Sequence, residues 1–269
     1  MMRAFTLGSG SAGNAILLEC GDTRVLIDAG YAARTLARRL AEIQVAPESI
    51  SAVVLTHEHI DHVRGVGVSQ SRWGWHVYGT KGTLDGVRDL DNERATAVAP
   101  LTPLTIGAIE CTLVRVPHDA AAPTAVLASH AASGYRVAIA HDLGQVPEML
   151  AQAMADVDLL MLESNHDEEM LRTGPYPVHL QRRIRAETGH LSNREAGLVL
   201  SERASTRWRE VVLLHLSETN NTPRHATTSA ERALRGARAV RPVTAVPQDA
   251  PAGPFGAGRG GRLQLSLAI

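Results

Sequence analysis

The sequence predicts an α/β (α+β) protein in which two β-sheets pack face to face between outer helices, as a four-layer αββα sandwich. Apolar runs of strand length alternate with helical patterns along most of the chain. Several runs are apolar at nearly every position, as strands buried on both faces require. Histidines and aspartates follow directly after several of these runs. We therefore expect the polar chemistry at one edge of the two sheets.

The individual elements follow from run length and periodicity. Strands are predicted at residues 24–28, 52–56, 110–116, 124–129, 135–140, 158–163 and 210–214. Helices are predicted at residues 32–43, 147–154, 176–187, 193–204 and 227–237. Ser192 followed by Glu195 fits a capping box, which marks the start of the fourth helix. The glycine-rich segment 8–13 lacks the GK[ST] ending of a phosphate loop and is predicted to be a tight turn between strands.

Composition excludes several classes of protein. The chain has 27 basic and 28 acidic residues, so its net charge of -1 excludes a strongly basic DNA-coating protein. No apolar run approaches the ~20 residues that a membrane helix needs, and the first residues lack the pattern of a secretory signal. We therefore expect a cytoplasmic protein without a membrane partner and without an obligate protein partner. Cys20 and Cys111 are too few for a disulfide framework and are predicted to be buried free thiols.

Metal-binding side chains are concentrated in the segment AVVLTHEHIDH. His57, His59, Asp61 and His62 lie within six residues, directly after a predicted buried strand. A turn is free of the two-residue alternation of a strand, so these side chains can converge. Nitrogen ligands with a carboxylate suit zinc, with manganese or iron as substitutes. Glu58, which lies between the histidines, is expected to point outward into solvent.

This HxHxDH string resembles the signature of the metallo-β-lactamase superfamily, and VPHDA, AHDLG and LLHLS resemble its later motifs. The resemblance implies the αββα fold with two divalent cations at the edge of the sheets. It implies one cation held by His57, His59 and His118, a second held by Asp61, His62 and His215, and Asp142 as the bridging ligand. Asp28, at the end of LIDAG, resembles a buried aspartate that orients the HxHxDH loop; a helix N-cap is the alternative.

A narrower resemblance indicates a branch of this superfamily. The segments LGSGSAGNA, LESNHD, TGPYP, GHLSN and HLSETNNTP are similar to the YycJ (WalJ) branch. That resemblance implies a metal-dependent phosphodiesterase that acts on DNA from the 5′ end. One departure is His141, which stands where a small hydroxyl residue is expected. Its side chain is predicted to alternate away from Asp142 and to be packed and hydrogen-bonded.

Candidate catalytic and substrate-binding residues surround these motifs. A phosphodiesterase needs an acid to protonate the departing oxygen, and His190 and His166 are the candidates, with Asp61 counted among the catalytic residues as well as the ligands. The candidates for substrate contact are Asn165, Asn193, Ser192 and Ser11. For the two asparagines, tying loops together is the alternative.

The ends of the chain complete the expected organisation. Residues 1–246 are predicted to form one hydrolase domain of the superfamily fold. Residues 247–261 are rich in proline and glycine and are predicted to be a flexible loop. In residues 262–269, apolar and other positions alternate, which predicts an edge strand of the same domain.

Two functions remain open from the sequence. For a nuclease, a cluster of arginines near GHLSN could follow a phosphate backbone: Arg182, Arg183, Arg185 and Arg194. The helix bearing Arg232, Arg235 and Arg238 is expected to be a solvated face. The alternative is hydrolysis of a small molecule such as a β-lactam, a lactone or a cyclic phosphodiester, since a metal pair serves all of these. His118 in Val-Pro-His-Asp, in place of a Gly-His-Thr type of turn, favours the nuclease.

Overall fold

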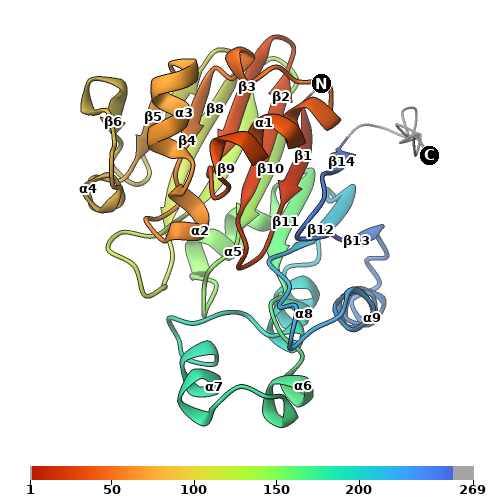
Figure 1. Cartoon of the computed structure of the whole chain (residues 1–269). Helices are drawn as coiled ribbons and strands as arrows, with labels where there is room; N and C mark the ends of the chain where they lie inside the picture. The colour runs from red at the N-terminus through yellow and green to blue at the C-terminus, as the bar shows by residue number, and fades with distance from the viewer. Residues whose placement is uncertain (1, 257–269) are drawn as a thin grey trace, which may run out of the picture.

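Two seven-stranded β-sheets pack face to face in the computed structural model, which describes residues 2–256 (Figure 1). The first sheet contains, in spatial order, β14 (Ala252–Phe255), β1 (Arg3–Gly8), β2 (Ala15–Cys20), β3 (Thr23–Ile27), β4 (Ala52–Val54), β5 (Val77–Gly79) and β6 (Ala95–Ala97). The second contains β13 (Val243–Ala245), β12 (Glu210–Leu214), β11 (Leu159–Glu163), β10 (Tyr135–Ala140), β9 (Thr124–His130), β8 (Ile109–Arg115) and β7 (Leu104–Ile106). Each sheet is antiparallel on one side and parallel on the other.

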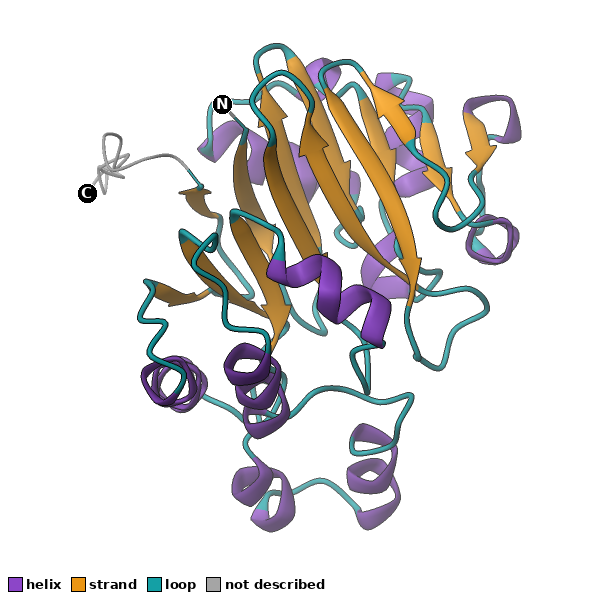
Figure 2. Cartoon of the chain, turned by 180° about the vertical axis from the view of Figure 1, so that it is seen from behind, coloured by secondary structure: helices purple, strands orange, loops and turns teal. Residues whose placement is uncertain are grey.

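Helices lie on the outer faces of both sheets and, in the case of α6 and α7, below the sheets (Figures 1 and 2). They are α1 (Ala33–Glu42), α2 (Ile60–Val63), α3 (Val66–Trp73), α4 (Lys81–Gly86), α5 (Glu148–Ala155), α6 (Glu168–Thr173), α7 (Val178–Ile184), α8 (Asn193–Glu202) and α9 (Pro223–Gly236). Two 3-10 turns occupy Pro47–Ser49 and Asn92–Arg94. Within residues 2–256, none of the helices has the length and apolar character that crossing a membrane requires.

Three apolar cores separate the four layers. Val25 belongs to the core between the sheets, whereas its neighbour Leu26 belongs to the core beneath α1 and α3. In the second sheet, Met161 faces the central core and Leu160 faces the core beneath α5, α8 and α9. Successive strand residues point to opposite faces, so a strand buried on both faces must be apolar throughout. This explains why continuous apolar runs, and not alternating ones, mark the central strands.

The predicted fold class is confirmed, and each strand and helix predicted within residues 2–256 overlaps an element of the same type. Cys20 and Cys111 are buried and free, as predicted. The bounds differ most at two helices. Only Val178–Ile184 of the predicted 176–187 is helical, because Pro177 precedes the first turn. The last helix begins at Pro223 and not at residue 227, because the Thr222 side chain accepts a hydrogen bond from the backbone NH of His225.

The predicted loop over residues 247–261 is wrong for four of them. Ala252–Phe255 form β14, which pairs with β1 at the edge of the first sheet. Phe255 packs into the core between the sheets, and this burial explains why the segment is ordered against β1. The edge strand predicted at residues 262–269 lies outside the described residues. The division of the chain into one domain, a loop and a terminal strand therefore stays a prediction.

Candidate metal centre

The polar ends of four strands meet at one edge of the sandwich. Asp28 follows β3, His57 lies shortly after β4, Asp142 lies shortly after β10, and His215 follows β12. Asp28, Asp142 and His215 have backbone φ angles of 61°, 56° and 54°. Residues other than glycine rarely adopt this left-handed conformation, which costs roughly 1–3 kcal/mol at each position. In this conformation the side chains no longer alternate between the two faces of the sheet as strand residues do, so they can converge.

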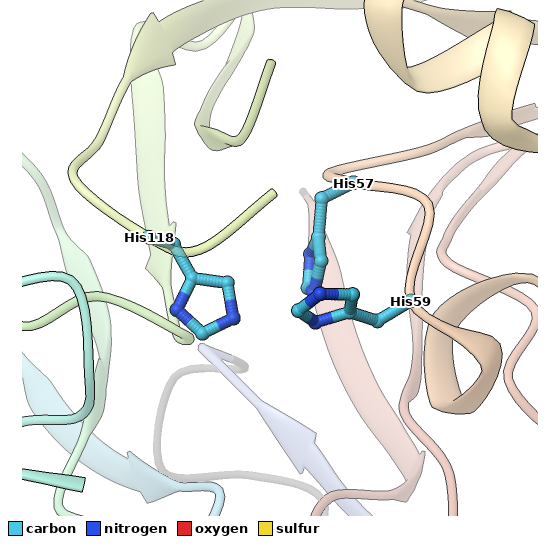
Figure 3. A group of neighbouring side chains, drawn as sticks. All are labelled: His57, His59 and His118. Atoms are coloured by element: carbon cyan, nitrogen blue, oxygen red, sulfur yellow. The ribbon is translucent and has the colours of Figure 1, made fainter. Parts of the chain in front are cut away.

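Three histidines form the first group of candidate ligands. Each of His57, His59 and His118 offers a ring nitrogen within 4.8 Å of those of the other two. Figure 3 shows the three imidazoles directed toward one another from two separate loops. His57 is only 1% exposed, and its Nε2 has no hydrogen-bond partner among residues 2–256. A buried unpaired nitrogen among neighbouring imidazoles fits a site for a divalent cation.

A second group, which combines carboxylates and histidines, adjoins the first. Asp61, His62 and His215 offer atoms that lie within 4.8 Å of one another. Asp142 lies beside this group, with Oδ2 3.0 Å from His62 Nε2 and Oδ1 3.5 Å from His215 Nδ1. Asp142 also forms a metal-capable group with His57 and His62, so it lies between the two sets of candidate ligands. The Nε2 of His215 is a further buried nitrogen without a partner in the described part of the chain.

Negative charge from the carboxylates is concentrated within the centre. Burial, reinforced by the neighbouring His62, holds the pKa of His57 well below its usual range, so its ring nitrogens are neutral. Burial raises the pKa of Asp61, but the neighbouring His215 and His62 lower it overall. Burial lowers the pKa of His215, whereas Asp142, Asp61 and Glu163 raise it to about 10, so a cation that binds this ring must displace a proton. The carboxylates thus concentrate negative charge here, which also attracts a divalent cation.

Asp28 orients His62 through the ring nitrogen that does not face Asp142. Its Oδ1 accepts a hydrogen bond from Thr56 N at 2.8 Å, and its Oδ2 accepts one from Thr56 Oγ1 at 2.8 Å. The same Oδ2 lies 2.7 Å from His62 Nδ1. When Nδ1 carries the proton, the lone pair of His62 Nε2 is free on the side of Asp142. This is the tautomer that a histidine needs in order to bind a metal ion. The alternative of a helix N-cap is wrong, because α1 is preceded by Ala32.

Two polar side chains lie elsewhere than predicted. His141 does not point away from Asp142, since its Nδ1 is 2.9 Å from Asp142 Oδ2 and its ring stacks on His62. The reason is that β10 ends at Ala140, so strand alternation no longer applies. Glu58 does not extend freely into solvent: its Oε1 accepts a hydrogen bond from Ala121 N at 2.7 Å.

Glu163 is an interacting residue that the sequence analysis missed. This fully buried carboxylate ends β11 and accepts a hydrogen bond from Leu143 N at 3.1 Å. Its Oε1 lies 2.8 Å from His190 Nδ1 and 3.1 Å from His215 Nδ1. Burial raises the pKa of Glu163, but His190 lowers it to about 2, so the carboxylate is charged. The sequence offered one signal for Glu163, which is that an acidic residue ends an otherwise apolar strand.

Asn14 also contacts the second group of ligands. Its side chain is buried, with Nδ2 3.0 Å from His62 Nε2 and 3.4 Å from Asp61 Oδ2. Its Oδ1 accepts a hydrogen bond from Gly10 N at 2.9 Å. The predicted glycine-rich turn between β1 and β2 therefore holds a polar side chain against the metal-binding loop.

The two candidate acids occupy different environments. His190 lies in the centre, with its ring centroid 5.3 Å from that of His118 and 5.2 Å from that of His215. Its side chain is 22% exposed, so a substrate can reach it. His166 is 1% exposed and belongs to none of the metal-capable groups in residues 2–256. A catalytic role for His166 stays a prediction.

Most of the predicted substrate contacts have partners within the protein. Asn165 Nδ2 donates a hydrogen bond to His215 O at 2.9 Å, and Asn193 Nδ2 donates one to Asn221 Oδ1 at 2.9 Å. Ser192 caps α8 through the predicted capping box with Glu195. These bonds tie loops together around the centre. Ser11, in contrast, is exposed and lines a pocket beside His190.

Comparison with known proteins finds similarity over most of the chain. Residues 23–247 match a family model described as "Beta-lactamase superfamily domain". The exodeoxyribonuclease WalJ of Streptococcus pneumoniae serotype 2 is 32% identical over 221 residues, which cover 80% of this chain and 81% of the relative. The exodeoxyribonuclease YycJ of Bacillus anthracis is 30% identical over 234 residues, which cover 85% and 87%. The metallo-beta-lactamase fold protein YhfI from Bacillus subtilis has a TM-score of 0.72 at 20% identity, covering 94% of this chain and 100% of that chain.

Proposed function

The chain belongs to the beta-lactamase superfamily and is a metal-dependent hydrolase, and from that premise we propose that it degrades DNA from the 5′ end as a phosphodiesterase with two divalent cations. One observation carries the proposal: a group of three histidines adjoins a group of Asp61, His62 and His215, with Asp142 between them. The assignment to DNA draws on the two exodeoxyribonucleases that are at least 30% identical over most of their length.

The donor set supports two cations, with zinc as the first expectation. His57, His59 and His118 would hold one of them. Asp61, His62 and His215 would hold the other, with Asp142 shared. Imidazole and carboxylate ligands suit zinc, manganese and iron. When bound, such cations supply positive charge that acidifies water and stabilises the negative charge that develops on a phosphodiester.

The chain's own residues are assigned the remaining steps. Water releases one proton to bulk solvent as its oxygen attacks phosphorus, the bond from phosphorus to the departing sugar oxygen breaks, and that oxygen takes a proton. We assign this proton to His190, which is partly exposed and held by Glu163 at 2.8 Å. Burial lowers the pKa of His190, but Glu163 and Asp142 raise it above its usual value, so the ring carries the proton to be donated. Asp61 is both a ligand and a catalytic residue in this assignment.

The experiment that tests the proposal compares substrate classes. Protein loaded with zinc or manganese is incubated with DNA labelled at its 5′ or 3′ end, single- and double-stranded, and in parallel with a chromogenic β-lactam. We expect nucleotides to be released from the 5′ end and a chelator to stop their release. A faster turnover of the β-lactam than of DNA would instead support the small-molecule hydrolase.

A surface lined by arginines supports the nucleic-acid substrate. A hollow of about 1190 Å³ lies where α6, α8 and α9 begin, and its lining includes Arg172, Arg185, Arg194, Arg224 and Arg232. Two of these, Arg185 and Arg194, belong to the arginine cluster predicted from the sequence. Guanidinium groups favour contact with phosphate, although Arg172 and Arg194 pair with Glu169 and Glu168 of the same lining. Arg232 lines this hollow and is exposed, in agreement with the solvated face predicted from the sequence.

The arginines of this hollow predict how the affinity for DNA depends on salt. Neither Arg224 nor Arg232 forms an ion pair within residues 2–256, so both are available to phosphate. The double variant R224A/R232A should bind DNA more weakly, with a slope of log affinity against log salt that is shallower by about 1 to 2. The measurement is fluorescence anisotropy of labelled DNA between low and moderate salt. The matched control is R34A/R38A on α1, which should keep the original slope; an unchanged slope in R224A/R232A would contradict the assignment.

A further inference from the structure

A pocket of about 210 Å³ opens beside His190, at the side of the candidate centre. Its aromatic and apolar part comes from Tyr176 and from α7, through Leu180 and Ile184. Its polar part includes Ser11, Asn165 and Ser217. Figure 1 shows α6 and α7 projecting below the two sheets, so α7 stands away from the αββα core. The pocket thus combines an apolar wall from this projection with polar groups from the loops that surround the centre.

The pocket shares side chains with the centre. His190 lines it and lies 2.8 Å from Glu163 Oε1 and 3.4 Å from Asp142 Oδ1. Asn165 also lines it, and its Nδ2 is 3.3 Å from His215 Nδ1. A group that occupies this pocket therefore lies directly next to the residues assigned to the reacting phosphate.

The wall formed by α7 is held in place relative to the centre. Arg183 Nε and Nη2 lie 2.8 Å and 2.6 Å from Asp119 Oδ2, and the carbonyl oxygen of Asp119 is 3.2 Å from His59 Nε2. At the end of the helix, Ile184 O accepts a hydrogen bond from His190 N at 2.9 Å. Two separate links thus join α7 to candidate ligand and acid residues, so the pocket is preformed.

We propose that this pocket binds the terminal nucleoside of the DNA strand, with its base against Tyr176, Leu180 and Ile184. The inference rests on the proposed function and deepens it. Pockets for drug-sized ligands measure roughly 300–1,000 Å³, so 210 Å³ holds at most one base and not two stacked bases. The pocket therefore selects chain ends over internal positions. An aromatic and aliphatic wall stacks on any base, so the choice of end is independent of sequence.

The base-binding role is tested by filling the pocket. Leu180→Trp places a large ring where the base is expected, and Val178→Trp is the matched control, because Val178 lies on the same helix, is 60% exposed and does not line the pocket. The substrates are two end-labelled oligonucleotides that differ only in a normal or an abasic 5′-terminal residue. We expect the unmodified protein and V178W to prefer the normal end by about tenfold, and L180W to lose this preference.

A binding measurement separates the pocket from the reaction. Titration calorimetry of the metal-loaded protein compares thymidine 5′-monophosphate with deoxyribose 5-phosphate, which lacks the base. We expect about tenfold tighter binding of the nucleotide, a loss of this difference in Tyr176→Ala and its retention in Tyr176→Phe, because stacking needs the ring and not the hydroxyl. Equal binding of the two ligands by the unmodified protein would overturn the inference. A base preference in binding without any DNA degradation would retain the pocket and reject the proposed function.

Discussion

Replacing His59 with alanine is expected to lower DNA degradation by at least about 10³-fold, equivalent to about 4 kcal/mol of transition-state stabilisation. His59 supplies one of the three nitrogens of the first candidate site, so its loss weakens cation binding where the negative charge of the reaction develops. The side chain is 32% exposed and contacts the carbonyl oxygen of Asp119 at 3.2 Å. Its truncation therefore opens no core cavity, and the fold should persist.

Three measurements separate this expectation from unfolding. Metal content by mass spectrometry should fall, whereas the circular dichroism spectrum and the melting temperature of the metal-free protein should match those of the parent. The matched control is His130→Ala, because His130 ends β9 and its Nδ1 contacts only Ser133 Oγ at 2.7 Å. If H59A bound the full metal complement and kept full activity, the assignment of the three-histidine group would be wrong.

Several central strands were predictable because their physical cause is local, although the inner strands β1, β2 and β5 were not predicted. A strand that is covered on both faces is apolar at nearly every position. The sequence shows this pattern at residues 24–28, 158–163 and 210–214. Edge strands lack this signal. β6, β7 and β13 are three residues long, which is below the roughly 4–8 residues that the pattern requires. β14 contains Gly253 and Pro254, which are both depleted in strands, and only its pairing with β1 defines it.

The candidate site likewise contains residues that a local motif reveals and residues that only the fold brings together. His57, His59, Asp61 and His62 form one short motif, so their proximity is visible in the sequence. The position of Glu163 depends on strand order, because β11 lies between β10, which leads to Asp142, and β12, which leads to His215. That order is set by pairing between distant segments, so a single sequence does not reveal that Glu163 reaches His190 and His215. The contacts of Asn14 are hidden from the sequence for the same reason, since its partners lie in a loop 47 and 48 residues away.

Removing the Glu163 carboxylate is expected to have the second largest effect. Glu163→Ala leaves Leu143 N, His190 Nδ1 and His215 Nδ1 without their buried acceptor. Breaking such a buried charged network costs about 3–5 kcal/mol of the free energy of unfolding, measured by urea denaturation of the metal-free protein. Because the pKa of Glu163 is lowered to about 2 by its histidine neighbours against the opposing effect of burial, this stabilisation is fully present above the roughly 4.3 of an unfolded glutamate and is lost as the pH falls toward 2.

Glu163→Gln separates the structural part of this role from the part that acts on turnover. The amide keeps the shape and one acceptor oxygen, so most of the stability should return. It lacks the negative charge that holds His190 and His215, and partners of this kind are worth about 10- to 100-fold in activity or metal affinity. We therefore expect E163Q to fold almost normally and to lose turnover by about that factor. The control is Glu202→Ala, which removes an exposed carboxylate from α8 and should change neither quantity. Parental turnover in E163Q would mean that the carboxylate only fills space at the end of β11, and His190 would then need another partner to hold its proton.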